Sequence, residues 1–195
     1  MKKIGMVSLG CPKNLVDTES LLGDLTRNGY ELTSEQDNAE VLIVNTCGFL
    51  QSSVKESIET ILEMAERKEN GPCRKLIVTG CLAERHPDEL LKEIPEIDHL
   101  LGVKQYPLLK NLISGKSSQR NLVHEPAQYF EEYGQRVLTT PSYTAYVKIA
   151  EGCSNKCAFC IIPKLRGPIQ SRTLESIVEE VQALAECGVK EINLV

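Results

Sequence analysis

The sequence predicts an α/β protein whose first hundred residues form a doubly wound parallel sheet. Short apolar segments, most of them rich in Val and Ile as buried parallel strands are, indicate strands at residues 4–10, 41–46, 75–80 and 99–103. Segments with the apolar spacing of helices separate them, at residues 15–29, 52–71 and 86–94. Strands that alternate with helices in this way are expected to lie parallel in one sheet.

The segment 52–71 shows the helical pattern over its whole length. Its apolar residues are expected on one face, namely Val54, Ile58, Ile61, Leu62 and Ala65. Ser53 and Glu56 have the spacing of a capping box, and Gly71 marks the expected end.

The alternation of strand-like and helix-like segments ends after residue 113. We expect this change to divide the chain into separate units. Residues 1–113 are expected to form a sheet of the flavodoxin or Rossmann type, and residues 114–141 a linker that includes a hairpin. A second unit, residues 142–195, begins with a strand-like segment and continues into a helix at 172–188. The apolar face of that helix is expected to hold Leu174, Ile177, Val178, Val181, Leu184 and Ala185. Its next strand is cut off at Val195, so we expect the N-terminal fragment of a longer protein.

Composition describes a soluble protein with an aliphatic core, since 42% of residues are hydrophobic and only 5% are aromatic. The apolar segment at the start is too short for a signal peptide or a membrane span, which predicts a cytoplasmic protein without membrane contact. Residues 141–195 hold six basic and six acidic side chains, so the net charge of −5 lies in residues 1–140. That balance argues against direct nucleic-acid binding by this region.

Three cysteines each follow a predicted strand: Cys11, Cys47 and Cys81. The carboxyl ends of parallel strands share one edge of the sheet, where such folds bind ligands. In the strand order 2-1-3-4-5, the three strands in question are neighbours, about 4.8 Å apart. We therefore expect these thiols to hold an iron–sulfur cluster, the alternative being three buried cysteines that act as small hydrophobic residues. The remaining cysteines outside the motif below, Cys73 and Cys187, are interpreted as spare thiols.

A second set of cysteines has the spacing C-x-x-x-C-x-x-C, at Cys153, Cys157 and Cys160. Structural zinc sites and ferredoxin-type clusters use four protein ligands, and no fourth Cys or His follows within the next 25 residues. Three cysteines on a four-iron cluster leave one iron open for a substrate or cofactor. The alternative is a zinc site completed by a residue beyond Val195.

With Phe159 before its last cysteine, this motif resembles the signature of the radical S-adenosylmethionine (SAM) enzymes. The resemblance implies that Cys153, Cys157 and Cys160 hold a 4Fe-4S cluster whose open iron binds SAM, and that Phe159 lies against the adenosyl group. It also implies that residues 142–195 begin a partial βα barrel, which is truncated here.

The first unit resembles the N-terminal domain of the methylthiotransferases, on the loops "SLGCPKNLVDTES", "VNTCGF" and "VTGCLAERHP". After "CAFC", the stretch "IIPKLRGPIQSR" resembles the same family, so the likeness covers essentially the whole chain. In that family, cysteines at the places of Cys11, Cys47 and Cys81 hold an auxiliary 4Fe-4S cluster. The family's later parts, the rest of the barrel and a C-terminal TRAM domain, are absent here.

Within the family, Pro12 and Lys13 in "GCPKN" resemble the branch that modifies a ribosomal protein, whereas tRNA-modifying members typically have a "GCQMN"-like loop. The resemblance thus implies a transferase that methylthiolates the β-carbon of an aspartate in the twelfth protein of the small ribosomal subunit. Two 4Fe-4S clusters and SAM are the implied cofactors. The implied partners are the ribosomal protein, free or in the small subunit, an electron donor and a sulfur source.

Two other functions are weighed against this one. A tRNA methylthiotransferase that modifies adenosine would use the same cofactors. A non-catalytic electron-transfer module with two clusters would need no vacant iron. Two three-cysteine sets would each leave an iron vacant, which argues against such a module. The fragment alone is expected to be inactive, because most SAM contacts of the family lie beyond Val195.

Overall fold

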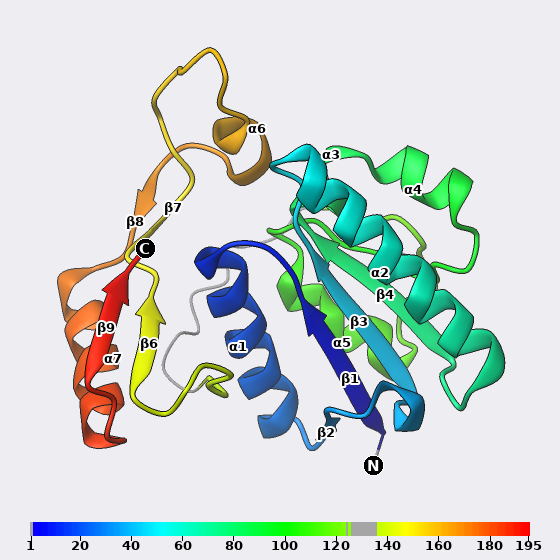
Figure 1. The fold of residues 1–195 in the computed structure, drawn as a ribbon, viewed down its shortest axis with the longest axis horizontal. Helices are drawn as coiled ribbons and strands as arrows, with labels where there is room; N and C mark the ends of the chain where they lie inside the picture. The colour runs from blue at the N-terminus through cyan, green and yellow to red at the C-terminus, as the bar shows by residue number, and fades with distance from the viewer. Residues whose placement is uncertain (1, 124, 126–135) are drawn as a thin grey trace.

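The computed structural model describes residues 2–123, 125 and 136–195, and its centre is a five-stranded parallel sheet (Figure 1). The strand order β2-β1-β3-β4-β5 is the one expected, and the predicted fold class is confirmed. The strands are β1 Lys3–Ser8, β2 Glu31–Thr33, β3 Val41–Thr46, β4 Lys75–Gly80 and β5 His99–Leu100. The second strand was not located from the sequence, because three residues are too few to show a pattern.

Helices cover both faces of this sheet. One face packs against α1 (Pro12–Arg27) and α5 (Leu109–Ser114), which follows the short helix η2 (Tyr106–Leu108). The other face packs against α2 (Gln51–Asn70), α3 (Cys81–Arg85) and α4 (Pro87–Glu93). A further short helix, η1 (Gln36–Asn38), precedes β3. Alternate residues of β3 pack into the two cores, so the strand is buried over its whole length. All of its residues before Asn45 are therefore apolar.

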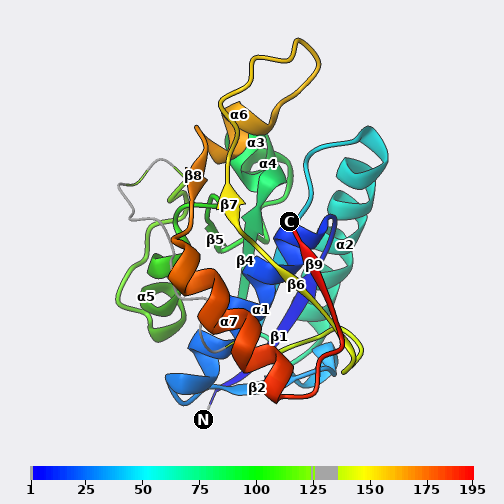
Figure 2. The ribbon, with the colours of Figure 1, turned by 90° about the vertical axis from the view of Figure 1, so that its left-hand side faces the viewer.

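The second unit forms two small sheets beside α1. β6 (Thr144–Val147) pairs in parallel with β9 (Glu191–Leu194), and α7 (Leu174–Glu186) is the crossover between them (Figure 2). β7 (Ala150–Glu151) pairs antiparallel with β8 (Gln170–Ser171), and α6 (Ile162–Arg166) lies between these two strands in the chain. Two parallel strands joined by a crossover helix form the expected βα arrangement.

The linker expected at 114–141, with its hairpin, lies partly outside the described residues. In its described part, Leu122 and Val123 are buried in the cores on the two faces of the sheet. Packing against the sheet therefore continues past residue 113, and the exact domain boundaries stay predictions. Among the described residues, no helix is long and apolar enough to cross a membrane.

The buried face of α7 is narrower than predicted. Leu184 is buried and Ile177 and Val181 are partly buried, whereas Leu174 is 71% exposed and Val178 and Ala185 are also exposed. The sheet beneath the helix has two strands, and so narrow a surface covers only a stripe of the helix.

Two expectations for α2 are wrong. The helix begins at Gln51 with Leu50 as its N-cap, and no side chain caps it, so Ser53 and Glu56 form no capping box. The predicted apolar face is also rotated: Ile61 and Ala65 are buried, but Ile58 is 36% and Leu62 49% exposed.

The physical reason for the rotation is a polar contact near the start of the helix. The Ser57 hydroxyl accepts a hydrogen bond from the Cys47 N–H (3.1 Å) and donates one to the Cys47 carbonyl (2.9 Å). This pair of bonds turns Ser57 toward the sheet, and Ile61 and Met64 follow on the same face. Apolar periodicity alone could not reveal that a serine belongs to the buried face.

We predict that Ile61→Ala lowers the free energy of unfolding by about 2–5 kcal/mol, because it leaves a cavity in the core. Leu62→Ala should cost less than about 1 kcal/mol, because that side chain is half exposed. Urea unfolding of both variants measures the difference, and equal losses would restore the face predicted from the sequence.

Candidate functional site

The structure brings Cys11, Cys47 and Cys81 together around one cavity of about 670 Å³, here called the cysteine pocket. Cys11 is the N-cap of α1, Cys47 follows β3, and Cys81 opens α3 directly after β4. Because β1, β3 and β4 are neighbours in the sheet, their carboxyl ends place the three cysteines side by side. The pocket is also lined from both units by Lys13, Phe49, Leu50, Glu151, Ile162 and Arg166.

The cysteine loops touch one another at glycines. Gly10 has a φ of +93°, and a Cβ built on it would lie 2.6 Å from the Cys47 Cβ and 2.8 Å from its Sγ. A Cβ on Gly48 would lie 2.9 Å from the backbone carbonyl group of Cys81. Only glycine, which has no Cβ, permits the cysteine loops to approach each other so closely. The three loops are therefore packed directly against one another.

The surroundings of the thiols differ. Cys47 and Cys81 are buried, whereas Cys11 is exposed at the pocket. Burial raises the pKa of the Cys81 thiol, and the nearby Arg166 guanidinium partly opposes this effect. A bound metal would favour the thiolate at each position.

Cysteine thiolates are the donors that hold iron–sulfur clusters. In the described part of the chain, no three His, Cys, Asp or Glu side chains converge as the ligands of one metal ion do. A four-iron cluster makes a different demand, because each thiolate binds a different iron and the ligands stay apart. Three thiols around a shared cavity meet that demand, and their role as ligands remains a prediction.

The second cysteine set lies on a loop between β7 and α6 that protrudes from the molecule (Figure 1). The Cys153 N–H donates to the Gly167 carbonyl (3.0 Å), and the Cys160 N–H donates to the Cys157 carbonyl (3.1 Å). Phe159 is 90% exposed. These four predicted site residues stay close together in the chain but do not line the cysteine pocket.

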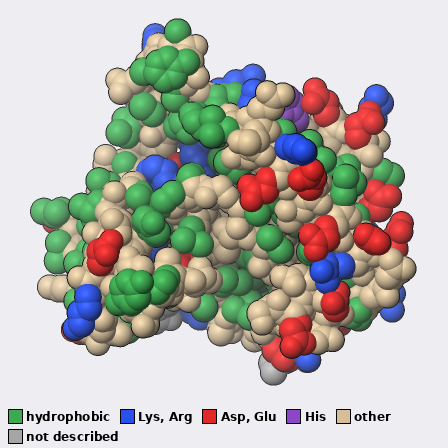
Figure 3. Space-filling view, in the orientation of Figure 1, with side chains coloured by type: hydrophobic (Ala, Val, Ile, Leu, Met, Phe, Trp, Pro, Cys, Tyr) green, Lys and Arg blue, Asp and Glu red, His purple; other side chains and the backbone are tan. Residues whose placement is uncertain are grey.

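The two sets nevertheless lie next to each other. Gly152, just before Cys153, and Ile162, two residues after Cys160, both line the cysteine pocket. The space-filling view shows a hollow in this region, with Lys and Arg side chains inside it and hydrophobic side chains around it (Figure 3). Both ends of the protruding loop thus border the cavity that the first set surrounds.

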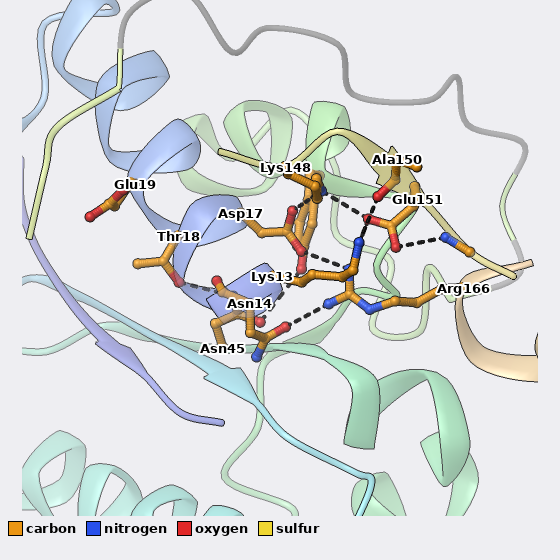
Figure 4. Close-up of polar contacts among 12 residues, drawn as sticks. Lys13, Asn14, Asp17, Thr18, Glu19, Asn45, Lys148, Ala150, Glu151 and Arg166 are labelled. Carbon is orange, nitrogen blue, oxygen red and sulfur yellow. Dashed lines mark hydrogen bonds and ion pairs between the residues drawn. The ribbon is translucent and has the colours of Figure 1, made fainter. Parts of the chain in front are cut away.

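A buried network of charged side chains joins the two units below this pocket, and the sequence analysis missed it. Arg166 donates to Asp17 (3.1 Å) and to Glu151 (2.8 Å), and the Lys148 ammonium pairs with the same two carboxylates, at 2.8 Å for Glu151 (Figure 4). Arg166 also donates to the Asn14 side-chain oxygen at 3.0 Å. All four charged residues are at most 7% exposed, and their two positive and two negative charges balance.

The network favours the charged state of Glu151. Burial alone would raise the pKa of Glu151, but Lys148 and Arg166 outweigh it and lower that pKa from 4.5 to about 2. Asp17 lies 131 residues from Lys148 and 149 from Arg166 in the chain, so no local pattern could pair them. The only signal in the sequence is a run of polar residues, Asp17 to Ser20, with apolar residues on both sides of it in the same predicted helix.

A second buried network lies further along α1. Glu19 accepts hydrogen bonds from the Thr139 N–H (2.7 Å) and hydroxyl (3.0 Å), and lies 3.6 Å from Arg136. Arg136 in turn lies 3.3 Å from Glu180 on α7, and Glu180 pairs with Arg172. One helix of the first unit is therefore fixed to the second unit through two charge-balanced contacts.

The models of two protein families match different parts of the chain. The model of the uncharacterized protein family UPF0004 matches residues 3–102, just over half of the chain, and the chain therefore belongs to this family. The model of the radical SAM superfamily matches residues 147–195, which contain the second cysteine set.

Among curated relatives, the protein of Geobacter sulfurreducens is 49% identical and that of Desulforamulus reducens 51% identical, each over all of this chain. Both are named ribosomal protein uS12 methylthiotransferase RimO, which confirms the resemblance to methylthiotransferases. The chain spans 44% and 45% of their respective lengths.

Solved structures confirm the fold at low sequence identity. The radical SAM methyltransferase TsrM from Kitasatospora setae, solved with tryptophan and a SAM analogue, has a TM-score of 0.64 and 14% identity. It is matched over all of this chain and 47% of its own length. The cobalamin-dependent radical SAM enzyme OxsB has a TM-score of 0.57 and 13% identity, over 96% of this chain and 32% of its own length.

We predict that Arg166→Met lowers the free energy of unfolding of the chain by about 3–5 kcal/mol, because it leaves Asp17 and Glu151 with a buried, uncompensated charge. The matched control is Lys55→Met, whose ion pair with Glu59 on α2 is exposed and should contribute less than about 1 kcal/mol. Urea unfolding compares the two. Equal losses would show that the buried network does not hold the units together.

Proposed function

We propose that this chain is the N-terminal part of a cytoplasmic radical SAM enzyme that methylthiolates the β-carbon of an aspartate in ribosomal protein uS12. One observation supports this most directly: three cysteines that follow three neighbouring strands line a pocket that is also lined by Gly152 and Ile162, at the two ends of the radical SAM motif loop. The names of the relatives supply the substrate, and Pro12 and Lys13 agree with that branch of the family.

In this proposal each cysteine set holds one 4Fe-4S cluster. When bound, the clusters and SAM would supply the carbon-centred radical and the methyl group, and the auxiliary cluster would carry the sulfur that is transferred. Cys153, Cys157 and Cys160 would leave one iron for SAM, with Phe159 against the adenosyl group, and Cys11, Cys47 and Cys81 would hold the auxiliary cluster. The reaction also requires an electron donor and a sulfur source, since protein side chains supply neither.

The contribution of the chain's own residues is to position these groups. The Asp17–Lys148–Glu151–Arg166 network fixes α1, whose N-cap is Cys11, against β7 and α6, which flank the motif loop. A reactive radical must meet its target before it is quenched, so a fixed separation of the two sites favours the transfer.

A protein substrate agrees better than tRNA with the charge of this region. Acidic side chains are numerous on the face over α2 and α4 in Figure 3, and the excess negative charge of the chain lies in residues 1–140. A phosphate backbone would be repelled by such a surface. Modification of tRNA adenosine is therefore the less favoured reaction.

We predict that the two cysteine sets are separable in the full-length enzyme. Cys157→Ala should abolish reductive cleavage of SAM, whereas Cys81→Ala should preserve it and abolish methylthio product. Anaerobic assays for 5′-deoxyadenosine and for product, together with iron analysis, measure both effects.

Cys73→Ala is the matched control, because Cys73 is a buried cysteine of the same unit that does not line the cysteine pocket. It should retain all iron and both activities. Loss of both activities from Cys81→Ala as well as from Cys157→Ala would indicate one shared metal site instead of two.

The substrate is tested by deleting the full-length gene. Mass spectrometry of ribosomal proteins should then show uS12 lighter by one methylthio group, while tRNA nucleosides stay unchanged. A loss of methylthioadenosine with uS12 unaffected would overturn the ribosomal-protein assignment and leave the radical chemistry intact.

A further inference from the structure

Four charged residues line the cysteine pocket. Two of them form an ion pair with each other, and a third is exposed to solvent. Arg166 and Glu151 bind each other within the buried network. Glu56 is exposed on α2. Lys13 differs from all three, because its half-buried ammonium donates one hydrogen bond, to the Ala150 carbonyl at 2.7 Å. Among the residues that the structure describes, no carboxylate lies within ion-pair distance of Lys13.

This leaves binding capacity at the Lys13 ammonium. An ammonium group has three donors, and the Ala150 carbonyl uses one of them. A charge that has lost part of its hydration gains more from a bound anion than an exposed charge does. The pocket therefore offers a partly desolvated cation with free donors to any anion that enters it.

We propose that Lys13 binds the side-chain carboxylate of the substrate aspartate and so selects this residue for modification, a proposal that rests on the proposed function. Lys13 lies two residues after Cys11, in the first turn of α1, and lines the same cavity as all three cysteines of the first set. The carboxyl carbon of an aspartate is bonded directly to its β-carbon. A residue that holds the carboxylate thus holds the β-carbon next to these thiols.

The rest of the pocket agrees with a peptide rather than a free anion. Phe49 and Leu50 line it from the α2 side and expose about half of their surface, and Ile162 and Leu165 line it from α6. Apolar walls of this kind can cover the flanking part of a bound peptide, while one cation inside fixes its orientation.

The test uses the full-length enzyme with both clusters reconstituted and without reductant, so that binding is measured in the absence of turnover. The probe is a fluorescent peptide that contains the target aspartate of uS12, compared with the same peptide carrying asparagine. For wild type we expect tighter binding of the aspartate peptide. Lys13→Gln should weaken that binding about 10- to 100-fold, the range for loss of a hydrogen bond to a charged group, and leave the asparagine peptide within about twofold.

Two variants serve as controls. Lys164→Gln removes the same charge from an exposed position on neighbouring α6, outside the pocket, and should leave both affinities unchanged. Lys13→Arg keeps the charge and should recover most of the preference for aspartate. Iron content and circular dichroism of each variant establish that the fold and clusters are intact.

The outcomes separate this proposal from the proposed function. If wild type binds the aspartate peptide and Lys13→Gln keeps the preference for aspartate, or weakens both peptides equally, Lys13 does not select the carboxylate. If wild type neither binds nor modifies the uS12 peptide, the proposed function fails, and the role of Lys13 fails with it.

Discussion

The arrangement of the two units depends on the buried charges of α1. This helix packs its apolar residues against the sheet. Its Asp17 meets the buried Lys148 and Arg166 of the second unit, and its Glu19 meets the buried side chain of Arg136, just before that unit. Charges removed from water must be paired with good geometry, because an unpaired one is costly. An apolar contact tolerates sliding, whereas paired charges and directed hydrogen bonds permit one register. We interpret the two networks as the reason that the cysteine pocket has walls from both units.

The sheet could be predicted from the sequence because each of its long strands contains a short run of apolar residues. β3 and β4 begin and end where the Val- and Ile-rich segments do, and the order of the strands followed from a common topology. The helices were harder, because an amphipathic pattern identifies a helix but not its rotation. In α2 that rotation follows from Ser57, a polar residue bonded to the backbone of a loop that precedes the helix.

The candidate site could be predicted only in part, for a related reason. A cysteine after each of three parallel strands is a local signal, and topology turns three such signals into one place. The ion pairs are different, since Asp17 and Arg166 are 149 residues apart and each resembles a solvated surface residue in its own segment. Their pairing depends on how two units pack, which no local pattern records.

The topology of the sheet also sets an order of events. Cys11, Cys47 and Cys81 come from separate loops, and β3 must lie between β1 and β4 before the outer two cysteines face a common cavity. A cluster bound by these thiols would thus bind the folded chain and not the unfolded one, and its binding free energy would add to the free energy of folding. During synthesis, the pocket cannot form until residues beyond Cys81 have emerged from the ribosome. In the proposed enzyme, insertion of this cluster would therefore require a chain in which β1, β3 and β4 already lie side by side.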